Sequence, residues 1–243
     1  MVERRLIDSL SSNISKVKAR IAKAAQRAGR DPAEITLVAV TKTQPVAVVR
    51  AAAAAGLIEF GENRIEEAAP KRAAAPAHLH WHMIGHVQSR KAREVAQAGF
   101  VLVHSVDSLK LAERLSRFAI EAGTGPQAIL LECNVSGEAS KAGFPAWEGL
   151  AQWEALLPDL EKIVELPGIS VRGLMTVAPV VPEPEAARPF FRRLRDLRDY
   201  LKIHWPPGDW RELSMGMTDD FETAIAEGAT LVRVGRALFG ERA

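Results

Sequence analysis

Residues 35–45 read Ile35-Thr36-Leu37-Val38-Ala39-Val40-Thr41-Lys42-Thr43-Gln44-Pro45. The first six are mostly β-branched or small and almost wholly apolar, which is typical of a short parallel strand buried on both faces. Pro45 suits the first helical position of the Ala-rich segment that follows. Lys42 is therefore predicted to lie in a loop at the carboxyl end of a strand, where α/β barrels and open α/β sheets gather their functional groups.

The same alternation of strand and helix patterns continues along the chain. A helical pattern over residues 3–29 comes first, and strands are then expected at 35–40, 57–60, 80–84, 101–103, 128–135, 170–174, 212–213 and 230–234. The later helices are expected to begin near Arg64, Arg90, Ser108, Trp147, Glu185, Thr218 and Arg236.

Eight strand-and-helix units without a long flexible linker favour one domain over residues 1–243. We predict an α/β fold, a single (β/α)8 TIM barrel with an additional N-terminal helix. An open doubly wound sheet is the alternative. It gains no support from glycine motifs, because neither a dinucleotide-binding motif after the first strand nor a P-loop motif occurs.

The composition limits the class of protein. Hydrophobic residues make up 47% and charged residues 26% of the chain, as expected of a soluble globular protein. Lys and Arg number 32 against 30 Asp and Glu, so no charge excess calls for a nucleic-acid or membrane partner. The start of the chain lacks the apolar core of a signal peptide, and we expect a cytoplasmic protein. Its one cysteine, Cys133, lies in an apolar run and is interpreted as an inert core thiol.

Closure of the barrel would bring polar residues from every strand end to one rim. The strand ends are Thr41-Lys42, Gly61-Glu62-Asn63, Gly85-His86, His104-Ser105, Asn134-Val135-Ser136, Met175-Thr176, Ser214-Met215-Gly216 and Arg233-Val234-Gly235. The loops after strands seven and eight are the usual phosphate site of this fold. There Gly216 and Gly235 let backbone amides approach an anion, Ser214 adds a hydroxyl, and Arg236 opens a short helix. Thr218-Asp219-Asp220 is interpreted as a helix N-cap with first-turn acids.

A reactive lysine and a phosphate site on one rim suit two ligands. One is pyridoxal 5′-phosphate, and the other is a phosphorylated sugar in an aldolase that works through a Schiff base. Arg233 favours the first, because a guanidinium facing the pyridine nitrogen would keep that nitrogen unprotonated. Such a ring is a poor electron sink, so efficient carbanion chemistry is not expected, although slow racemisation is compatible with it.

Several motifs resemble those of the pyridoxal phosphate homeostasis proteins, the YggS/PROSC family. They are Ala39-Val40-Thr41-Lys42-Thr43, Phe60-Gly61-Glu62-Asn63, Trp81-His82-Met83-Ile84-Gly85, Gly173-Leu174-Met175, Leu213-Ser214-Met215-Gly216-Met217-Thr218-Asp219-Asp220, and Val232-Arg233-Val234-Gly235 followed by Phe239-Gly240. The resemblance runs from about residue 5 to residue 242. It implies the barrel of alanine racemase, a pyridoxal phosphate cofactor bound through Lys42, and a role in handling vitamin B6 with little or no catalysis.

The resemblance also implies the site residues. Asn63 is expected beside the cofactor ring, Arg233 at its nitrogen, and Ser214, Gly235 and Arg236 at the phosphate. Met217, within the same motif as Ser214, is counted with the cofactor-binding residues.

The sequence departs from the family at three places. Arg236 stands where Ser or Thr is more frequent, so the backbone amide, with or without the guanidinium, takes over from a hydroxyl. Arg64 replaces an aromatic residue, and Arg90 stands where Asn is expected before Lys91. These changes affect rim contacts rather than the Schiff base.

Two enzyme classes are alternatives. A pyridoxal-phosphate-dependent amino-acid racemase needs a second acid–base group, which alanine racemase supplies as a tyrosine from a second domain, whereas this chain has one tyrosine, Tyr200, in a helical pattern. A metal hydrolase would use His80 and His82, but a structural histidine is the favoured interpretation of His82, and no metal is expected. Delivery of the cofactor to apoenzymes or to enzymes of vitamin B6 metabolism stays open. So does the oligomeric state, for which a monomer or weak dimer is expected.

Overall fold

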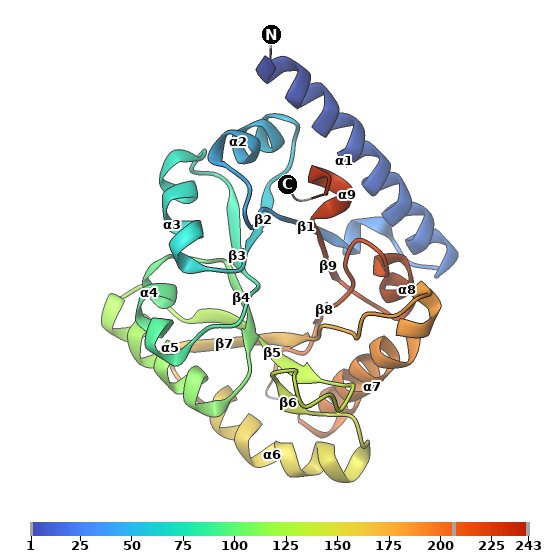
Figure 1. Ribbon diagram of the computed structural model, residues 1–243. Coiled ribbons are helices and arrows are strands. Elements are labelled where there is room, and N and C mark those ends of the chain that lie inside the picture. The colour runs from blue at the N-terminus through green and yellow to red at the C-terminus, as the bar shows by residue number, and fades with distance from the viewer. Residues whose placement is uncertain (1, 206–207, 242–243) are drawn as a thin grey trace.

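The computed structural model describes residues 2–205 and 208–241, and its strands close into a barrel (Figure 1). Within these residues eight parallel strands pair in a ring: β1 (Thr36–Val40), β2 (Glu59–Glu62), β3 (His80–Met83), β4 (Leu102–Val106), β5 (Gln127–Asn134), β7 (Ile169–Met175), β8 (Glu212–Ser214) and β9 (Leu231–Val234). Pairing of β1 with β9 and of β4 with β5 closes the ring. The predicted (β/α)8 barrel is confirmed.

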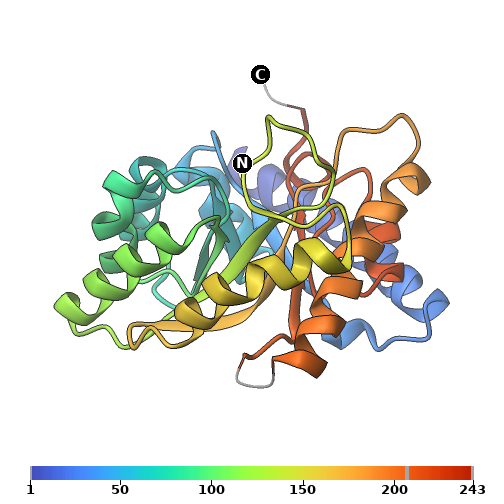
Figure 2. The same ribbon diagram turned by 90° about the horizontal axis from the view of Figure 1, so that it is seen from below.

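Helices cover the outside of the ring (Figures 1 and 2). They are α2 (Val46–Ala54), α3 (Ile65–Ala74), α4 (Ala92–Gln97), α5 (Leu109–Ala122), α6 (Leu150–Val164), α7 (Arg188–His204), α8 (Phe221–Ala226) and α9 (Arg236–Phe239), with 3-10 turns η1 (Pro32–Glu34), η2 (Ser89–Lys91) and η3 (Pro184–Ala187). Nearby residues set both ends of α5. The Ser108 hydroxyl caps the first turn by accepting a hydrogen bond from the Leu111 N–H, and Gly123 ends the helix with a φ of 65°. Within the described ranges, no helix combines the length and apolar character that crossing a bilayer requires.

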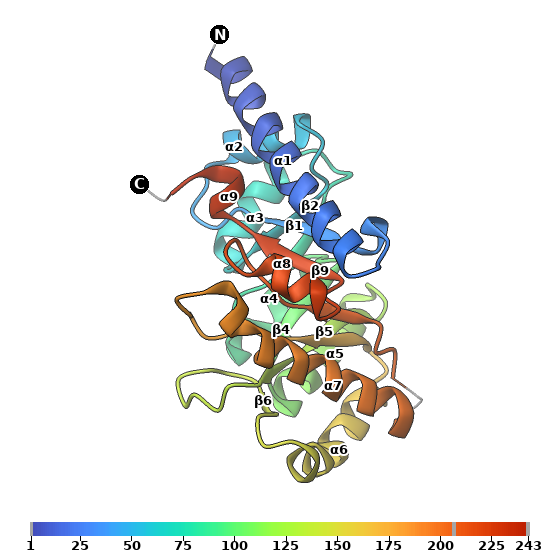
Figure 3. The same cartoon turned by 90° about the vertical axis from the view of Figure 1, so that its right-hand side faces the viewer.

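The additional N-terminal helix, α1 (Val2–Arg27), lies against α2, α8 and α9 (Figures 1 and 3). Its buried residues follow a spacing of three to four positions and form one apolar face: Leu10, Ile14, Val17, Ile21, Ala24 and Ala25. α1 therefore joins the helical layer through its packing on these three helices.

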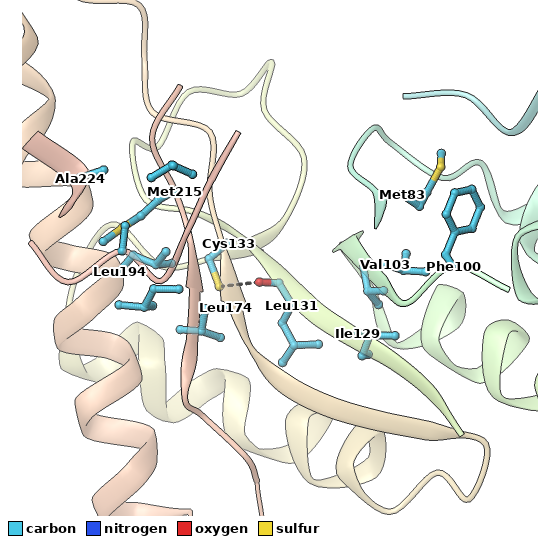
Figure 4. Close-up of a cluster of buried hydrophobic side chains, with 14 of the residues drawn as sticks. Met83, Phe100, Val103, Ile129, Leu131, Cys133, Leu174, Leu194, Met215 and Ala224 are labelled. Carbon is cyan, nitrogen blue, oxygen red and sulfur yellow. Dashed lines mark hydrogen bonds between the residues drawn. The ribbon is translucent and has the colours of Figure 1, made fainter. Parts of the chain in front are cut away.

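Two apolar cores follow from the alternation of side chains along the strands. The outer core fills the space between strands and helices, and Figure 4 shows part of it, with Ile129, Leu131 and Leu174 from the strands and Leu194 and Ala224 from the helices. The inner core is small and takes one residue from each of five strands: Val38, Leu102, Leu130, Met175 and Leu231. The remaining inward positions nearer the strand ends are therefore free to be polar.

Cys133 belongs to the outer core (Figure 4), where its Sγ lies 3.7 Å from the Leu131 carbonyl oxygen. Burial, followed by the charge of Glu132, raises the pKa of this thiol well above its usual range. The predicted core position of this thiol is confirmed, and a thiol that stays protonated is a poor nucleophile.

Some local predictions were wrong. α6 begins at Leu150 rather than near Trp147, and β6 (Phe144–Pro145), a two-residue strand beside the end of β5, was not expected. Pro45 precedes α2 instead of opening it. The predicted end residues 1, 242 and 243 of the domain lie outside the described residues.

The interpretation of Thr218 as an N-cap was also wrong. α8 begins only at Phe221, and the Asp220 carboxylate accepts the N–H of Met217 at 2.6 Å. The Thr218 hydroxyl instead accepts the N–H of Ala237 at 3.4 Å, from the neighbouring α9. The Thr218 hydroxyl thus bonds to a residue that is distant in the sequence and not to the first turn of α8.

Candidate functional site at the carboxyl ends of the strands

Lys42 lies on the barrel rim directly after β1 and is half-buried. The loops after β5 and β7 and the helix α9 project on this same side of the barrel (Figures 2 and 3). A cavity of about 360 Å³ beside Lys42 is also lined by Gly235, Arg236 and Phe239. Because β1 and β9 pair from Thr36↔Leu231 to Ala39↔Val234, the residues that follow these strands meet. The structure thus brings together three predicted site residues, Lys42, Gly235 and Arg236.

The loop that carries Lys42 is held by α3. Thr43 has a φ of 65°, which residues other than glycine seldom adopt, and its N–H donates to Glu67 Oε2 at 2.8 Å. The Gln44 N–H donates to the Thr41 carbonyl oxygen at 3.0 Å. A strained backbone conformation of this kind costs of order 1–3 kcal/mol and persists only where neighbours impose it. These contacts therefore hold the Lys42 backbone in one conformation.

A buried ion pair beside this loop was missed in the sequence. Lys71 of α3 is 6% exposed, and Glu62 at the end of β2 is fully buried. Lys71 Nζ donates to Glu62 Oε1 and to the Thr41 carbonyl oxygen, both at 2.7 Å. The Thr41 hydroxyl donates to the same Oε1 at 2.6 Å. A signal was present, since Lys71 follows Ile65 and Ala68 at three-residue spacing on the buried face of α3, where a cation needs a partner.

Arg233 points into the barrel and is 4% exposed. Its Nη1 donates to the Ser214 hydroxyl, and its Nη2 donates to the Thr176 carbonyl oxygen at 2.8 Å. Burial lowers the pKa of Arg233 to about 10, while the carboxylates of Glu132 and Asp220 act in the opposite direction. The guanidinium therefore keeps its charge at neutral pH.

Ser214 is fully buried and has a second partner, His104, whose Nδ1 lies 2.8 Å from the hydroxyl oxygen. Ser214 does not line the cavity beside Lys42. A serine hydroxyl has one hydrogen, so donating it to His104 leaves none for a phosphate oxygen. The phosphate contact of Ser214 stays a prediction, and it competes with the bond to His104.

Asn63 does not line the cavity beside Lys42, although β1 and β2 are neighbouring strands that pair at Val40↔Gly61. It lines another cavity, of about 470 Å³, with Arg64, His86 and Lys91. Its backbone packs against Gly85, where a Cβ would lie 2.4 Å from the Asn63 carbonyl oxygen, so only glycine fits. The structure thus fixes the position of Asn63 without bringing it to the cavity beside Lys42.

Met217 and Arg236 flank the last two strand ends. Met217 is 37% exposed and lines a third cavity, of about 520 Å³, together with Val180 and Asp219. Arg236 pairs with Asp219 and, at 3.2 Å, with Glu241. The bond to Asp219 raises the pKa of the Arg236 guanidinium. A phosphate would have to compete with these two carboxylates for this side chain.

His82 is 4% exposed inside the barrel, and both of its ring nitrogens have protein partners. Its Nε2 lies 2.8 Å from Glu59 Oε2, and its Nδ1 lies 2.9 Å from His104 Nε2. Among residues 2–205 and 208–241, no group of three or more His, Cys, Asp or Glu side chains is arranged to hold a metal ion. The partners at both ring nitrogens agree with the structural role that the sequence favoured for His82.

Glu132 is a further polar residue inside the barrel that the sequence did not single out. Burial raises the pKa of its carboxyl group, and the nearby carboxylate of Asp107 adds to this shift. Glu132 interrupts the apolar run of β5, and that interruption is the signal that could have marked it.

Sequence comparisons agree with this architecture. The family described as alanine racemase, N-terminal domain, matches residues 12–243. The pyridoxal phosphate homeostasis protein of Pseudomonas aeruginosa is 48% identical over 238 residues, covering 97% of each chain. The protein of that name from Aquifex aeolicus is 41% identical over 230 residues, covering 94% of this chain and 96% of that one.

Solved structures extend the comparison. PipY of Synechococcus elongatus without pyridoxal phosphate is 35% identical with a TM-score of 0.82, covering 95% of this chain and 100% of that one. Alanine racemase of Streptomyces coelicolor is 21% identical with a TM-score of 0.69, covering 97% of this chain and 59% of that one, and it shows the shared fold alone. The sequence identity of 41–48% to these bacterial relatives, over nearly the full length of the chain, shows the family. The chain belongs to the pyridoxal phosphate homeostasis protein family, built on the barrel of the alanine racemase N-terminal domain.

Proposed function

We propose that this protein binds pyridoxal 5′-phosphate, holds it as a Schiff base on Lys42, and acts in vitamin B6 homeostasis with little or no catalysis. The observation that carries the proposal is the cavity shared by Lys42, Gly235 and Arg236. An amine, backbone amides and a guanidinium in one cavity match an aldehyde and a phosphate on one small ligand. The relatives' name and the PipY structure with pyridoxal phosphate bound support it.

The residues present fit this cofactor. The cavity of about 360 Å³ lies within the range of roughly 300–1,000 Å³ that is usual for small-molecule sites. Pyridoxal phosphate supplies an aldehyde, which condenses with a lysine amine to a Schiff base and water. Lys42 would provide the amine. Gly235 and Arg236 would hold the phosphate, because both line the cavity where the chain passes from β9 into α9, and the first amides of a helix have no partner within it.

Arg233 is proposed to face the ring nitrogen. A guanidinium can donate hydrogen bonds but not accept them, and the buried Arg233 stays protonated, so a ring nitrogen facing it must accept. Asn63 and Met217 line neighbouring cavities, and their contact with the cofactor rests on the family resemblance alone.

The direct test is the absorption spectrum of the protein supplied with pyridoxal phosphate, before and after borohydride reduction. Reduction should remove the Schiff-base band and fix the cofactor to one peptide, the one that contains Lys42. A reduced adduct found wholly on another lysine, such as Lys91 or Lys141, would show that the central assignment is wrong.

Ser214→Ala separates two roles of this hydroxyl. A direct phosphate contact would make the loss specific to the phosphorylated ligand, about ten- to a hundredfold, since a hydrogen bond to a charged group is worth roughly 1.5–3 kcal/mol. Because Ser214 is bonded to His104 and Arg233, we expect instead that pyridoxal phosphate and pyridoxal are weakened by the same factor. Titration of both ligands decides, with Ser214→Thr as the variant that keeps the hydroxyl.

Turnover of free amino acids is expected to be negligible. Tyr200 lies in α7 on the outside of the barrel, where its ring lies tilted against those of Trp153 and His204, so it is no acid–base group for the rim. A general acid or base typically contributes about 10²–10⁴-fold, and its absence leaves at most a slow side reaction. Deuterium exchange at the α-carbon of alanine measures this, with Lys42→Ala as the blank. A kcat of about 1–10³ s⁻¹ would make the racemase alternative correct.

Three further expectations belong to this proposal. One is that residues 1–243 act as a single pyridoxal-phosphate-binding domain, which limited proteolysis with and without the cofactor would test. The second is a cytoplasmic location, testable by cell fractionation. The third is that pyridoxal-phosphate-dependent apoenzymes or enzymes of vitamin B6 metabolism exchange the cofactor with it, and activation of an apoenzyme by the loaded protein would measure this.

A further inference from the structure

A continuous line of hydrogen bonds crosses the inside of the barrel from Glu59 to Arg233. Glu59 Oε2 lies 2.8 Å from His82 Nε2, and His82 Nδ1 lies 2.9 Å from His104 Nε2. His104 Nδ1 lies 2.8 Å from Ser214 Oγ, which accepts a hydrogen bond from Arg233 Nη1. The five residues come from β2, β3, β4, β8 and β9. Since β4 and β8 are not neighbours in the ring, the bond between His104 and Ser214 spans the barrel interior.

The line joins two different environments. At its first end, His80 Nδ1 lies 2.7 Å from Glu59 Oε1, and both residues line a cavity of about 380 Å³ with Arg172, Arg211 and Glu212. The His80 side chain is 52% exposed, so this end of the line is open to solvent. At the other end Arg233 is buried. The line therefore runs from the amino ends of the strands to the buried guanidinium that is proposed to face the ring nitrogen of the cofactor.

The protonation of Glu59 decides which atoms donate and which accept along the line. Burial alone raises the pKa of Glu59, but the hydrogen bonds from His82 and His80 outweigh it and lower the pKa. Glu59 is therefore a carboxylate, which can only accept hydrogen bonds. His82 must carry its hydrogen on Nε2.

The protonation of His104 follows from its burial. Burial lowers the pKa of His104 well below its usual range, and the charge of Arg233 acts in the same direction. A neutral imidazole has one donor and one acceptor nitrogen, so two arrangements remain. In the first, His104 donates from Nε2 to His82, and Ser214 donates its hydrogen to His104 Nδ1.

In the second arrangement His104 donates from Nδ1 to Ser214, and His82 must then be an imidazolium. Ser214 would accept from both His104 and Arg233, and its own hydrogen would have no acceptor among the hydrogen bonds of the described residues. A buried donor without a partner costs about 1–3 kcal/mol. The first arrangement gives every hydrogen in the line an acceptor.

We propose that Glu59, His82, His104 and Ser214 are positioning residues, which form a directional hydrogen-bond line that holds the Arg233 guanidinium in one orientation. The line turns a lone pair of Ser214 toward Arg233 Nη1, while the Thr176 carbonyl oxygen accepts from Nη2. Held at both Nη atoms, the planar guanidinium cannot rotate freely. The inference rests on the proposed function only where it assigns Arg233 to the ring nitrogen of the cofactor.

The first test uses the apoprotein labelled with ¹⁵N and needs no cofactor. Long-range ¹H–¹⁵N spectra at neutral pH should show His82 and His104 as neutral rings, both with the hydrogen on Nε2. The signals are assigned by single substitution of each histidine with glutamine. A charged His82, or a His104 with its hydrogen on Nδ1, overturns the direction of the line and with it the proposal.

The second test reads Arg233 itself in the same apoprotein. We expect separate ¹⁵N signals for Nη1 and Nη2 in the unaltered protein, because rotation of the guanidinium is slow. Ser214→Ala and His104→Leu should merge these signals, and Ser214→Thr should restore them. His80→Ala is the matched control, since His80 contacts the same carboxylate outside the line, and it should leave them separate. Unchanged Arg233 signals in folded Ser214→Ala would show that the line does not hold the guanidinium.

The third test separates the line from the cofactor contact. The unaltered protein should bind pyridoxal phosphate at least about tenfold more tightly than an analogue with CH in place of the ring nitrogen, because one charged hydrogen bond is lost. His104→Leu should reduce this preference. If His104 had only a structural role, the substitution would lower the affinity for both ligands equally and leave the preference unchanged. That result would overturn the positioning role. If the apoprotein spectra gave the expected result while the protein bound both ligands equally well, that outcome would support the hydrogen-bond line and contradict the proposed contact of Arg233 with the ring nitrogen.

Discussion

Lys42→Ala is expected to abolish the borohydride-reducible adduct with pyridoxal phosphate completely. Among the described residues that line the cavity with Gly235 and Arg236, Lys42 supplies the only amine, and the groups that remain can hold the phosphate but not the aldehyde. Lys42→Arg should fail equally, because a guanidinium is not a nucleophile at neutral pH. Absorption spectra and the mass of the reduced protein measure the result.

Lys91→Ala serves as the matched control for this experiment. Lys91 lines the neighbouring cavity and pairs with Glu66 at 2.9 Å, so it is a rim lysine in a different place. Its substitution should leave the adduct intact. If the adduct survived in Lys42→Ala and disappeared in Lys91→Ala, the cofactor site would be the cavity lined by Lys91 and not the one lined by Lys42.

Lys71→Met is expected to destabilise the fold by about 3–5 kcal/mol, the usual effect of removing one partner of a buried ion pair. Glu62, which is fully buried, would keep only the Thr41 hydroxyl as a hydrogen-bond partner among the described residues. For a chain of this size the loss corresponds to a fall in melting temperature of roughly 6–20 °C. Thermal unfolding measures it.

The effect of Lys71→Met should depend on pH in one direction. Burial raises the pKa of Glu62 in the folded protein above its unfolded value, and hydrogen bonds from Lys71 and Thr41 oppose the shift. A group with a raised folded pKa contributes most stability below its unfolded pKa, and that contribution is lost as the pH rises through the folded pKa. The variant, in which Lys71 no longer opposes the shift, should therefore be penalised most at neutral and higher pH and recover as Glu62 takes up a proton.

Two variants make the comparison sharp. Glu62→Gln combined with Lys71→Met removes both charges and should recover most of the lost stability. Lys162→Met removes a lysine from an exposed pair with Asp159, which is worth at most about 1 kcal/mol. A Lys71→Met variant no less stable than Lys162→Met would contradict the assignment of Glu62 and Lys71 as a buried pair.

The order of the strands, the barrel and the place of Lys42 could all be predicted from the sequence. Hydrophobic runs, glycines and prolines report local conformation, and regular alternation of strands and helices leaves few closed arrangements. The meeting of Lys42 with Gly235 and Arg236 also followed, because adjacent first and last strands are a consequence of closure. Boundaries were less predictable, as at Thr218, whose hydroxyl found a partner in α9.

The sequence by itself determined the barrel and the loop that carries the lysine, because both depend on patterns among near neighbours in the chain. Only the tertiary structure decided how the site's polar residues are partnered. Ser214 meets His104, 110 positions away, because the register of the closed ring sets which side chains point inward. No local pattern contains that register, so the hydrogen-bond line from Glu59 to Arg233 becomes visible only in three dimensions. The same is true of the finding that Asn63 and Lys42 line different cavities.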